Sequence, residues 1–277
     1  PCSNPTLSVF PTVEEIDADY VPGSPCRPVA GDPAPICAFG VSRAKARRHF
    51  ALIGDSHALH WRRAVDVVAL AERWRGFSIT TAACPFSAAV DQLPQGLRAL
   101  CQAWYRSALE WFDDHPEVST VLVSAFAPLP VEVRGVPSGG GREVVRIKVA
   151  GYRRAWRALP RTVKHVVVVR DVPMTSQATF DCVQRVIAEG TRPPGPACTE
   201  SRAYALRWDT AVSAARTLRS RRYQSVDLTG FFCRRSCDPV IGGARVYRDP
   251  FGHITTAYSR TLGPYLHRKV RRLMRSW

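Results

Sequence analysis

Hydrophobic positions along the chain repeat with two different periods. Short runs that are apolar at almost every position indicate strands buried on both faces. Longer segments with apolar residues three or four positions apart indicate amphipathic helices. The two kinds of segment alternate through most of the chain. We therefore predict strands over residues 49–53, 77–81, 118–124, 165–169 and 225–228, and helices over residues 58–73, 97–113, 145–159, 199–219 and 255–274.

This alternation predicts the fold class. Strands buried on both faces and separated by helices form a parallel sheet that helices cover on both sides. We expect a three-layer α/β/α sandwich with a flavodoxin-like, five-stranded parallel sheet, built from residues 47–277. Residues 1–46 are rich in proline, serine and aspartate and show little periodicity. We expect them to form an irregular N-terminal extension tied by disulfides.

The chain is strongly basic, with 39 lysines and arginines against 23 acidic residues and a net charge of +16. Only four of the cations are lysines, and the 35 arginines are spread along the chain rather than gathered in a stripe. No motif that reads nucleic acid accompanies the charge, so we expect no nucleic-acid partner. A solvated basic surface that faces an anionic cell envelope is the better interpretation.

Two further features indicate where the protein works. No apolar run reaches the roughly 20 residues of a membrane helix, and the chain opens with Pro1 and without a signal peptide, which suggests a fragment of a longer precursor. Nine cysteines are many for a cytosolic enzyme, and none has the spacing of a metal site, so we expect an oxidising compartment and no metal. Buried free cysteines are the alternative, because sequence alone does not prove connectivity. Neighbouring positions in loop-like sequence suggest four local disulfides, with Cys2 left over: Cys26–Cys37, Cys84–Cys101, Cys182–Cys198 and Cys233–Cys237.

The four residues Gly54-Asp55-Ser56-His57 follow the first predicted strand. Glycine permits a tight turn from strand to helix. The serine then lies near the N-terminus of the next helix, where free N–H groups and the helix dipole stabilise negative charge. A nucleophilic serine needs these conditions, because its tetrahedral intermediate carries an oxyanion. The alternative is an ordinary Asp or Ser cap at a strand–helix junction.

A nucleophilic serine needs a base, and the base needs a group that orients it. His253 lies in the loop before the last predicted helix, at the sheet edge where such folds bind ligands. It is placed to take the proton of Ser56, with Asp249 holding the imidazole. His57 follows the serine in a tight turn and is expected to point away, and the other histidines lie in predicted helices, at a helix end or at the beginnings of strands. Without the Gly-Asp-Ser segment, this Asp/His loop would be read as a surface turn.

With both segments in place, the sequence resembles the SGNH (GDSL-like) hydrolase superfamily. More specifically, it resembles the C-terminal SGNH domain of membrane-bound O-acyltransferases of the acyltransferase family 3 type, which modify exported glycans. The resemblance spans residues 26–272. It rests on the order and spacing of several segments: Cys37-Ala38-Phe39-Gly40, residues 51–58, Cys84-Pro85, Cys101 with Trp104, Asp171-Val172-Pro173, Asp227-Leu228 with Cys233 and Cys237, and Asp249 with His253-Ile254-Thr255.

The resemblance implies a function in two steps. Ser56 would accept an acyl group, acetyl being the first expectation, and His253 would then activate a hydroxyl of a cell-envelope or exported glycan. A transmembrane acyltransferase domain, N-terminal in the precursor, would use the acyl donor, such as acetyl-CoA, and the SGNH domain itself would need no cofactor. The domain would be extracytoplasmic, either periplasmic or on the outer face of a bacterial membrane, and tethered to that membrane. A carbohydrate esterase and a catalytically degenerate glycan-binding domain are the alternatives.

The sequence departs from the family pattern in two places. Family members usually place the aspartate three residues before the histidine, whereas Asp249 is four residues before His253. The classical superfamily also completes its oxyanion hole with a glycine after the second strand and an asparagine after the third, and the fused acyltransferase domains often lack both. Here the only asparagine is Asn4. We expect the Ser56 backbone N–H to remain a donor, with the Ser124 hydroxyl and a backbone N–H near Ala82 as tentative further donors.

Overall fold

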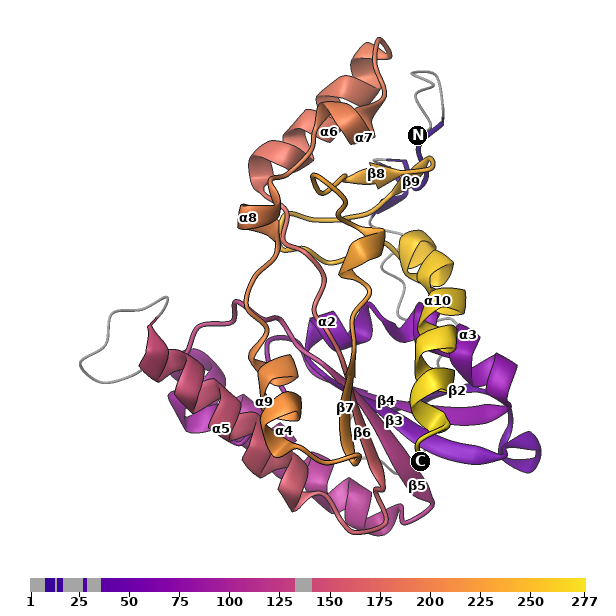
Figure 1. Cartoon of the computed structure of the whole chain (residues 1–277), viewed down its shortest axis with the longest axis vertical. Helices are drawn as coiled ribbons and strands as arrows, with labels where there is room; N and C mark the ends of the chain where they lie inside the picture. The colour runs from indigo at the N-terminus through magenta and orange to yellow at the C-terminus, as the bar shows by residue number, and fades with distance from the viewer. Residues whose placement is uncertain (1–7, 13, 17–26, 29–35, 133–140) are drawn as a thin grey trace.

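A computed structural model describes residues 8–12, 14–16, 27–28, 36–132 and 141–277. Within these residues, a sheet of seven strands has the order β1-β2-β4-β3-β5-β6-β7 (Figure 1). The five strands from β4 to β7 in this order are parallel. Their arrangement is that of a flavodoxin-like sheet, which confirms the predicted fold class. These strands are β3 (Arg48–Gly54), β4 (Trp74–Thr80), β5 (Val118–Ser124), β6 (His165–Val169) and β7 (Tyr223–Val226).

The sheet extends beyond the five predicted strands at one edge. β2 (Cys37–Gly40) pairs antiparallel with β4, and β1 (Arg27–Pro28) pairs antiparallel with β2. The prediction of irregular structure for residues 1–46 is wrong for β2. Four residues are too few to show a hydrophobic period, so the sequence pattern did not indicate this strand. Phe39 of this strand packs edge-on against Phe50, with the ring centroids 5.4 Å apart. The division of the chain at residue 46 itself stays a prediction.

Helices cover both faces of the sheet (Figure 1). Alternate residues of the central strand β3 point to opposite faces of the sheet. Phe50 and Leu52 therefore pack in one hydrophobic cluster, and Ala51 and Ile53 pack in the other. This explains why the strand is apolar throughout. The first cluster contains residues of α3 (Arg62–Glu72) and α10 (Thr256–Met274), and the second contains residues of α4 (Gln95–Asp114), α5 (Arg142–Ala158) and α9 (Thr210–Leu218).

The predicted helix over residues 199–219 is wrong as a single element. The structure has α8 (Arg202–Ala205) and α9, separated by an irregular stretch. Asp209 ends that stretch, because its Oδ1 caps α9 by accepting from the N–H groups of Ala211 at 2.8 Å and Val212 at 3.0 Å. Its Oδ2 accepts from Asp171 N at 2.9 Å. A contact with a distant segment therefore overrides the local helical pattern.

The remaining elements are short or lie outside the layers. The predicted helix over residues 58–73 is divided into α2 (Ser56–Leu59) and α3. Two helices that the pattern did not predict, α6 and α7, project from the sandwich together with the hairpin β8–β9 (Figure 1). Their bounds are α6 (Gln177–Glu189), α7 (Pro194–Ala197), β8 (Val240–Ile241) and β9 (Ala244–Arg245), and the 3-10 helices are η1 (Arg43–Lys45), η2 (Val90–Gln92) and η3 (Thr229–Phe231).

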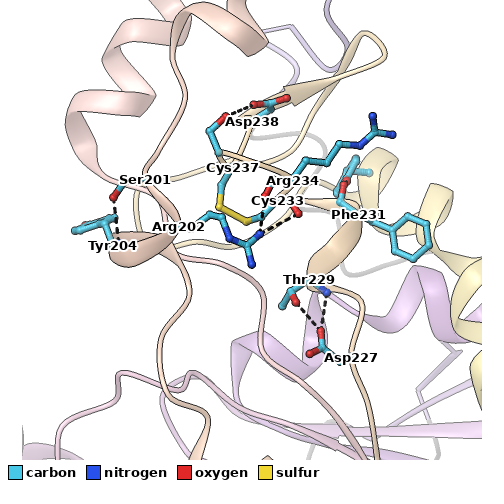
Figure 2. Close-up of a disulfide and its surroundings, with 12 residues drawn as sticks. Ser201, Arg202, Tyr204, Asp227, Thr229, Phe231, Cys233, Arg234, Cys237 and Asp238 are labelled. Carbon is cyan, nitrogen blue, oxygen red and sulfur yellow. Dashed lines mark hydrogen bonds between the residues drawn. A yellow bond between two sulfur atoms is a disulfide. The ribbon is translucent and has the colours of Figure 1, made fainter. Parts of the chain in front are cut away.

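Disulfides join segments that are close in the sequence. Cys37 is also disulfide-bonded, but Cys26, its predicted partner, and the unpaired Cys2 lie outside the described residues. None of the described helices has the length and apolar character needed to cross a membrane. Three predicted disulfides are confirmed: Cys84–Cys101, Cys182–Cys198 and Cys233–Cys237, the last of which closes a tight loop after β7 (Figure 2).

The turn at the end of β3 depends on Gly54. Its φ of +146° lies in a region that L side chains rarely adopt, and a Cβ at this position would meet Ser124 O at 1.9 Å. Gly54 and Ser124 face each other across β3 and β5. The backbone of β5 therefore leaves no room for a side chain, and only glycine lets the chain turn from β3 into α2.

Replacing Gly54 tests this constraint. We expect Gly54→Ala to lower the free energy of unfolding by at least about 2 kcal/mol, because the added methyl group must displace the β5 backbone and the conformation is strained. Urea unfolding measures the effect. The matched control is Gly96→Ala in α4, where an added Cβ meets nothing within 4 Å. This control should be neutral or stabilising by up to about 1 kcal/mol. Equal stability of the two variants would contradict the account of the turn.

Candidate active site

Ser56 is the first residue of α2, directly after the carboxyl end of β3. The preceding Asp55 fixes this turn with both carboxylate oxygens. Oδ1 accepts from His57 N at 2.8 Å and caps α2, and Oδ2 accepts from Phe126 N at 2.9 Å in the loop after β5. Asp55 is completely buried, and burial raises the pKa of its carboxyl group. The serine is thus held at the sheet edge by a bond network that includes a second loop.

The structure brings the three predicted site residues together. His253 Nε2 lies 2.8 Å from Ser56 Oγ, and His253 Nδ1 lies 2.7 Å from Asp249 Oδ2. In the tautomer that donates Nδ1–H to the carboxylate, Nε2 accepts the hydrogen of the Ser56 hydroxyl. Ser56 and His253 are separated by 197 positions in the sequence, so only the folding of the last loop onto the β3 edge creates this contact.

The additional residue between Asp249 and His253 is absorbed by the loop. Asp249 Oδ1 accepts from Phe251 N at 3.0 Å and from His253 N at 3.2 Å, which folds the loop around the carboxylate. Gly252 adopts a φ of +87° within this turn. Oδ2 remains available for the imidazole. The departure from the three-residue spacing therefore does not separate the aspartate from the histidine.

The charge state of Asp249 is set by its neighbours. Burial acts to raise the pKa of this carboxyl group, but the hydrogen bond and charge of His253 and the charge of Arg248 outweigh it. The net effect lowers the pKa of Asp249 below its ordinary value. Arg248 Nε lies 3.4 Å from Asp249 Oδ2. An ionised carboxylate at this position is the form that stabilises a protonated imidazole.

His57 was expected to point away from the site, but its ring is buried beside it. Its centroid lies 4.8 Å from the ring of His253, and its Nδ1 lies 2.7 Å from Asp171 Oδ1. Burial acts to lower the pKa of His57, but the carboxylates of Asp171 and Asp55 raise it overall. These carboxylates therefore favour the protonated form of the His57 imidazole, which lies beside the His253 ring. Sequence reasoning missed this pair, although Asp171 follows directly after a buried strand at the carboxyl edge.

Asp171 connects the loops that surround the site. Its Oδ2 accepts from Ala127 N at 2.7 Å in the loop after β5, and its Oδ1 also accepts from Val172 N at 2.8 Å. Among the described residues, His57, His60 and Asp171 offer ligand atoms within 4.8 Å of one another, as a metal site would require. Both oxygens of Asp171 and Nδ1 of His57 are already hydrogen-bonded, whereas neither ring nitrogen of His60 has a hydrogen-bond partner among the described residues. We therefore assign no metal to this group.

The structure places the three tentative oxyanion donors at positions that are not equally favourable. Thr81 N donates to Gly54 O at 3.2 Å, so the turn that contains Ala82 lies beside the start of the Ser56 turn. Ser124 lies opposite Gly54 but is completely buried, and its Oγ has no hydrogen-bond partner within the described part of the chain. Ala82 N and Ser56 N are therefore better candidates than the Ser124 hydroxyl, and the roles of all three remain predictions.

Comparisons with known proteins agree with this architecture. A family model described as the SGNH domain (fused to AT3 domains) matches residues 25–268. No curated protein matches the chain. Among solved structures, the chain is similar to the periplasmic domain of a lipopolysaccharide acetyltransferase from Salmonella ser. Paratyphi A. The TM-score is 0.56 with 14% sequence identity, over 84% of this chain and 90% of that chain, which shows a common fold.

The lowered pKa of Asp249 makes a prediction about stability. The folded-state pKa lies below the ordinary value of 3.8, so the carboxylate stabilises the fold above that value, and this contribution is lost as the pH falls through the folded-state pKa. We expect the difference in free energy of unfolding between the wild type and Asp249→Asn to be largest well above pH 3.8 and to shrink as the pH falls below that value. Urea unfolding at a series of pH values measures it.

The control for this series is Asp114→Asn at the exposed end of α4, which reports the effect of losing one carboxylate far from the site. A difference for Asp249→Asn that stays constant from pH 7 to pH 2 would show that the carboxylate gains nothing from His253 and Arg248.

Proposed function

The chain belongs to the family of SGNH domains that are fused to AT3 domains, and from this premise we propose that it transfers acyl groups through an ester formed on Ser56. Family membership and the fold shared with an acetyltransferase domain support an acyl-transfer or esterase-like role. The observation that carries the proposal is the pair of hydrogen bonds that joins Ser56 to His253 and His253 to Asp249. A hydroxyl, an imidazole and a carboxylate in this order activate a nucleophile.

The first half of the reaction forms the ester. Ser56 Oγ attacks the carbonyl carbon of the acyl donor while His253 Nε2 takes the hydroxyl proton. Asp249, ionised beside Nδ1, stabilises the imidazolium that results. The tetrahedral intermediate collapses when the donor's leaving group departs with the proton from His253. The acyl group is then bound to Ser56 as an ester, and His253 is neutral again.

The second half transfers the acyl group to an acceptor. A hydroxyl of a glycan approaches His253 Nε2, which removes its proton while the oxygen attacks the ester carbonyl. Ser56 Oγ leaves and recovers the proton from His253, so the enzyme returns to its starting state. Water that enters in place of the sugar gives hydrolysis by the same steps. A carbohydrate esterase is therefore the second candidate function, and the same hydrogen bonds support it.

Negative charge develops on the carbonyl oxygen in both halves. We assign its stabilisation to the backbone N–H of Ser56 at the start of α2 and to the N–H of Ala82, with Ser124 as a weaker candidate. The missing glycine and asparagine of the classical superfamily also raise a third reading, a degenerate domain that only binds glycan. The bonded arrangement of Ser56, His253 and Asp249 favours catalysis over that reading.

Family membership supports a proposal for the cellular setting. Fusion to AT3 domains supports an N-terminal acyltransferase domain in the membrane that delivers the acyl group to this domain. We propose an extracytoplasmic location, because the similar solved structure is a periplasmic domain and the described cysteines form disulfides, which persist in oxidising compartments. The proposed acceptor is a glycan of the cell envelope or an exported glycan, and the donor is an acyl thioester such as acetyl-CoA used by the membrane domain.

Variants of the three residues test the proposed chemistry. Ser56→Ala and His253→Ala should each lower the rate of p-nitrophenyl acetate hydrolysis by more than about 10³-fold, because the nucleophile or its base is lost. Asp249→Asn should lower it by about 10²–10⁴-fold, because the imidazole then presents the wrong tautomer. Release of p-nitrophenol measures each rate, and thermal unfolding checks that each variant is folded.

Ser107→Ala, in the middle of α4, is the matched control and should hydrolyse at the wild-type rate. Wild-type hydrolysis by Asp249→Asn alone would mean that a Ser–His dyad suffices. Wild-type hydrolysis by Ser56→Ala would exclude the proposed nucleophile and favour the glycan-binding reading.

A further inference from the structure

A hollow of about 390 Å³ lies at the carboxyl edge of the sheet, next to the loops that hold the site. The loop after β5, the first turns of α5, and the stretch between α8 and α9 surround it. Its lining is largely apolar, with a small number of polar groups, which is the usual make-up of a site for a small molecule or a sugar. The lining residues used below are Ala127, Leu129, Lys148, Met174, Arg207 and Trp208.

This hollow adjoins the candidate active site through one side chain, Met174. A Cβ built on Gly252, in the loop between Asp249 and His253, would lie 3.8 Å from Met174 Sδ and 3.7 Å from His57 Cε1. Met174 therefore lies against the catalytic loop on one side and lines the hollow on the other. A ligand in the hollow would be a neighbour of the loop that carries His253.

Trp208 borders the hollow with 71% of its surface exposed. The adjacent Arg207 is also exposed, and its guanidinium lies over the ring of Tyr204 at 4.8 Å. These side chains present a flat apolar surface beside a permanent cation. The other cation of the lining is already used: Lys148 Nζ donates to Ala127 O at 2.7 Å and to Leu129 O at 2.9 Å.

The segment that carries Trp208 is anchored at both ends. At one end, Arg202 donates to the carbonyl oxygens of Cys233 and Arg234 in the disulfide-closed loop (Figure 2). At the other end, Asp209 caps α9 and accepts from Asp171 N, and Asp171 in turn holds His57. The backbone next to Trp208 is therefore fixed relative to the catalytic network. An exposed aromatic ring on a fixed backbone pays little entropy on binding.

We propose that Trp208 and this hollow bind a pyranose ring of the acceptor glycan. A pyranose has an apolar C–H face and a rim of hydroxyl groups, so its face stacks on the indole while Arg207 donates to the rim. Placed there, the sugar lies beside Met174, which lies against the loop that carries His253. This inference rests on the proposed function only in identifying the sugar as the acyl acceptor. Binding of the sugar itself does not depend on acyl chemistry.

Binding to oligosaccharides tests the proposal without using activity. The full 277-residue chain carrying Ser56→Ala is titrated calorimetrically with chitohexaose and with hexagalacturonic acid, which share the pyranose ring and differ in charge. We expect at least one of them to bind, and Trp208→Ala in this background to weaken that binding by about tenfold or more. Trp208→Phe should recover most of the affinity, because a stacking surface is kept. Thermal unfolding verifies that both variants are folded.

The matched control is Leu70→Ala, which removes another exposed apolar side chain on α3, and it should bind as the parent does. Failure of both sugars to bind, or equal affinity of the parent and Trp208→Ala, would overturn the proposal. Loss of self-association in Trp208→Ala on a sizing column would also overturn it, because a second copy would then cover the ring. Sugar binding that depends on Trp208 in a protein whose Ser56 proves unreactive would leave this site standing while the proposed catalysis fails.

Discussion

The site depends on two buried carboxylates at the carboxyl edge of the sheet. Asp55 bonds the start of α2 to the loop after β5, and Asp171 bonds that same loop to His57. Burying a carboxylate costs several kcal/mol unless hydrogen bonds or an opposite charge satisfy it. Here backbone N–H groups and the His57 ring meet that need. The loops after β3, β5 and β6 are thereby joined into one frame, in which Ser56 has a fixed position.

His253, the proposed base, reaches this frame from the other end of the chain. Thr255 caps α10 and donates its hydroxyl to Arg245 O, and Tyr247 and Ile254 form a bridge. The loop that carries Asp249 and His253 is therefore closed at its base before α10 begins. Because α10 packs along α3 on one face of the sheet, the loop is directed toward the start of α2. The position of His253 beside Ser56 thus follows from helix packing as much as from the loop itself.

Local sequence signals account for the parts that could be predicted. The strands β3 and β6 contain continuous apolar runs, and Ser56 and His253 lie beside residues that favour a strand–helix junction and a helix cap. Features that depend on distant partners left no such signal. β2 is too short to show a period, and the helix over residues 199–219 is interrupted because Asp209 bonds to Asp171. The His57–Asp171 pair joins residues 114 positions apart, which no local pattern records.

The central claim is that Ser56 carries the acyl group, and trapping the ester tests it most directly. The protein is mixed with p-nitrophenyl acetate, quenched in acid within the first turnovers and digested for peptide mass spectrometry. The account predicts one acetyl group per chain, on the peptide that contains Ser56, and its loss on prolonged incubation or on addition of a glycan acceptor. Turnover without an acetylated Ser56, or acetylation at another side chain such as Lys148, would contradict it.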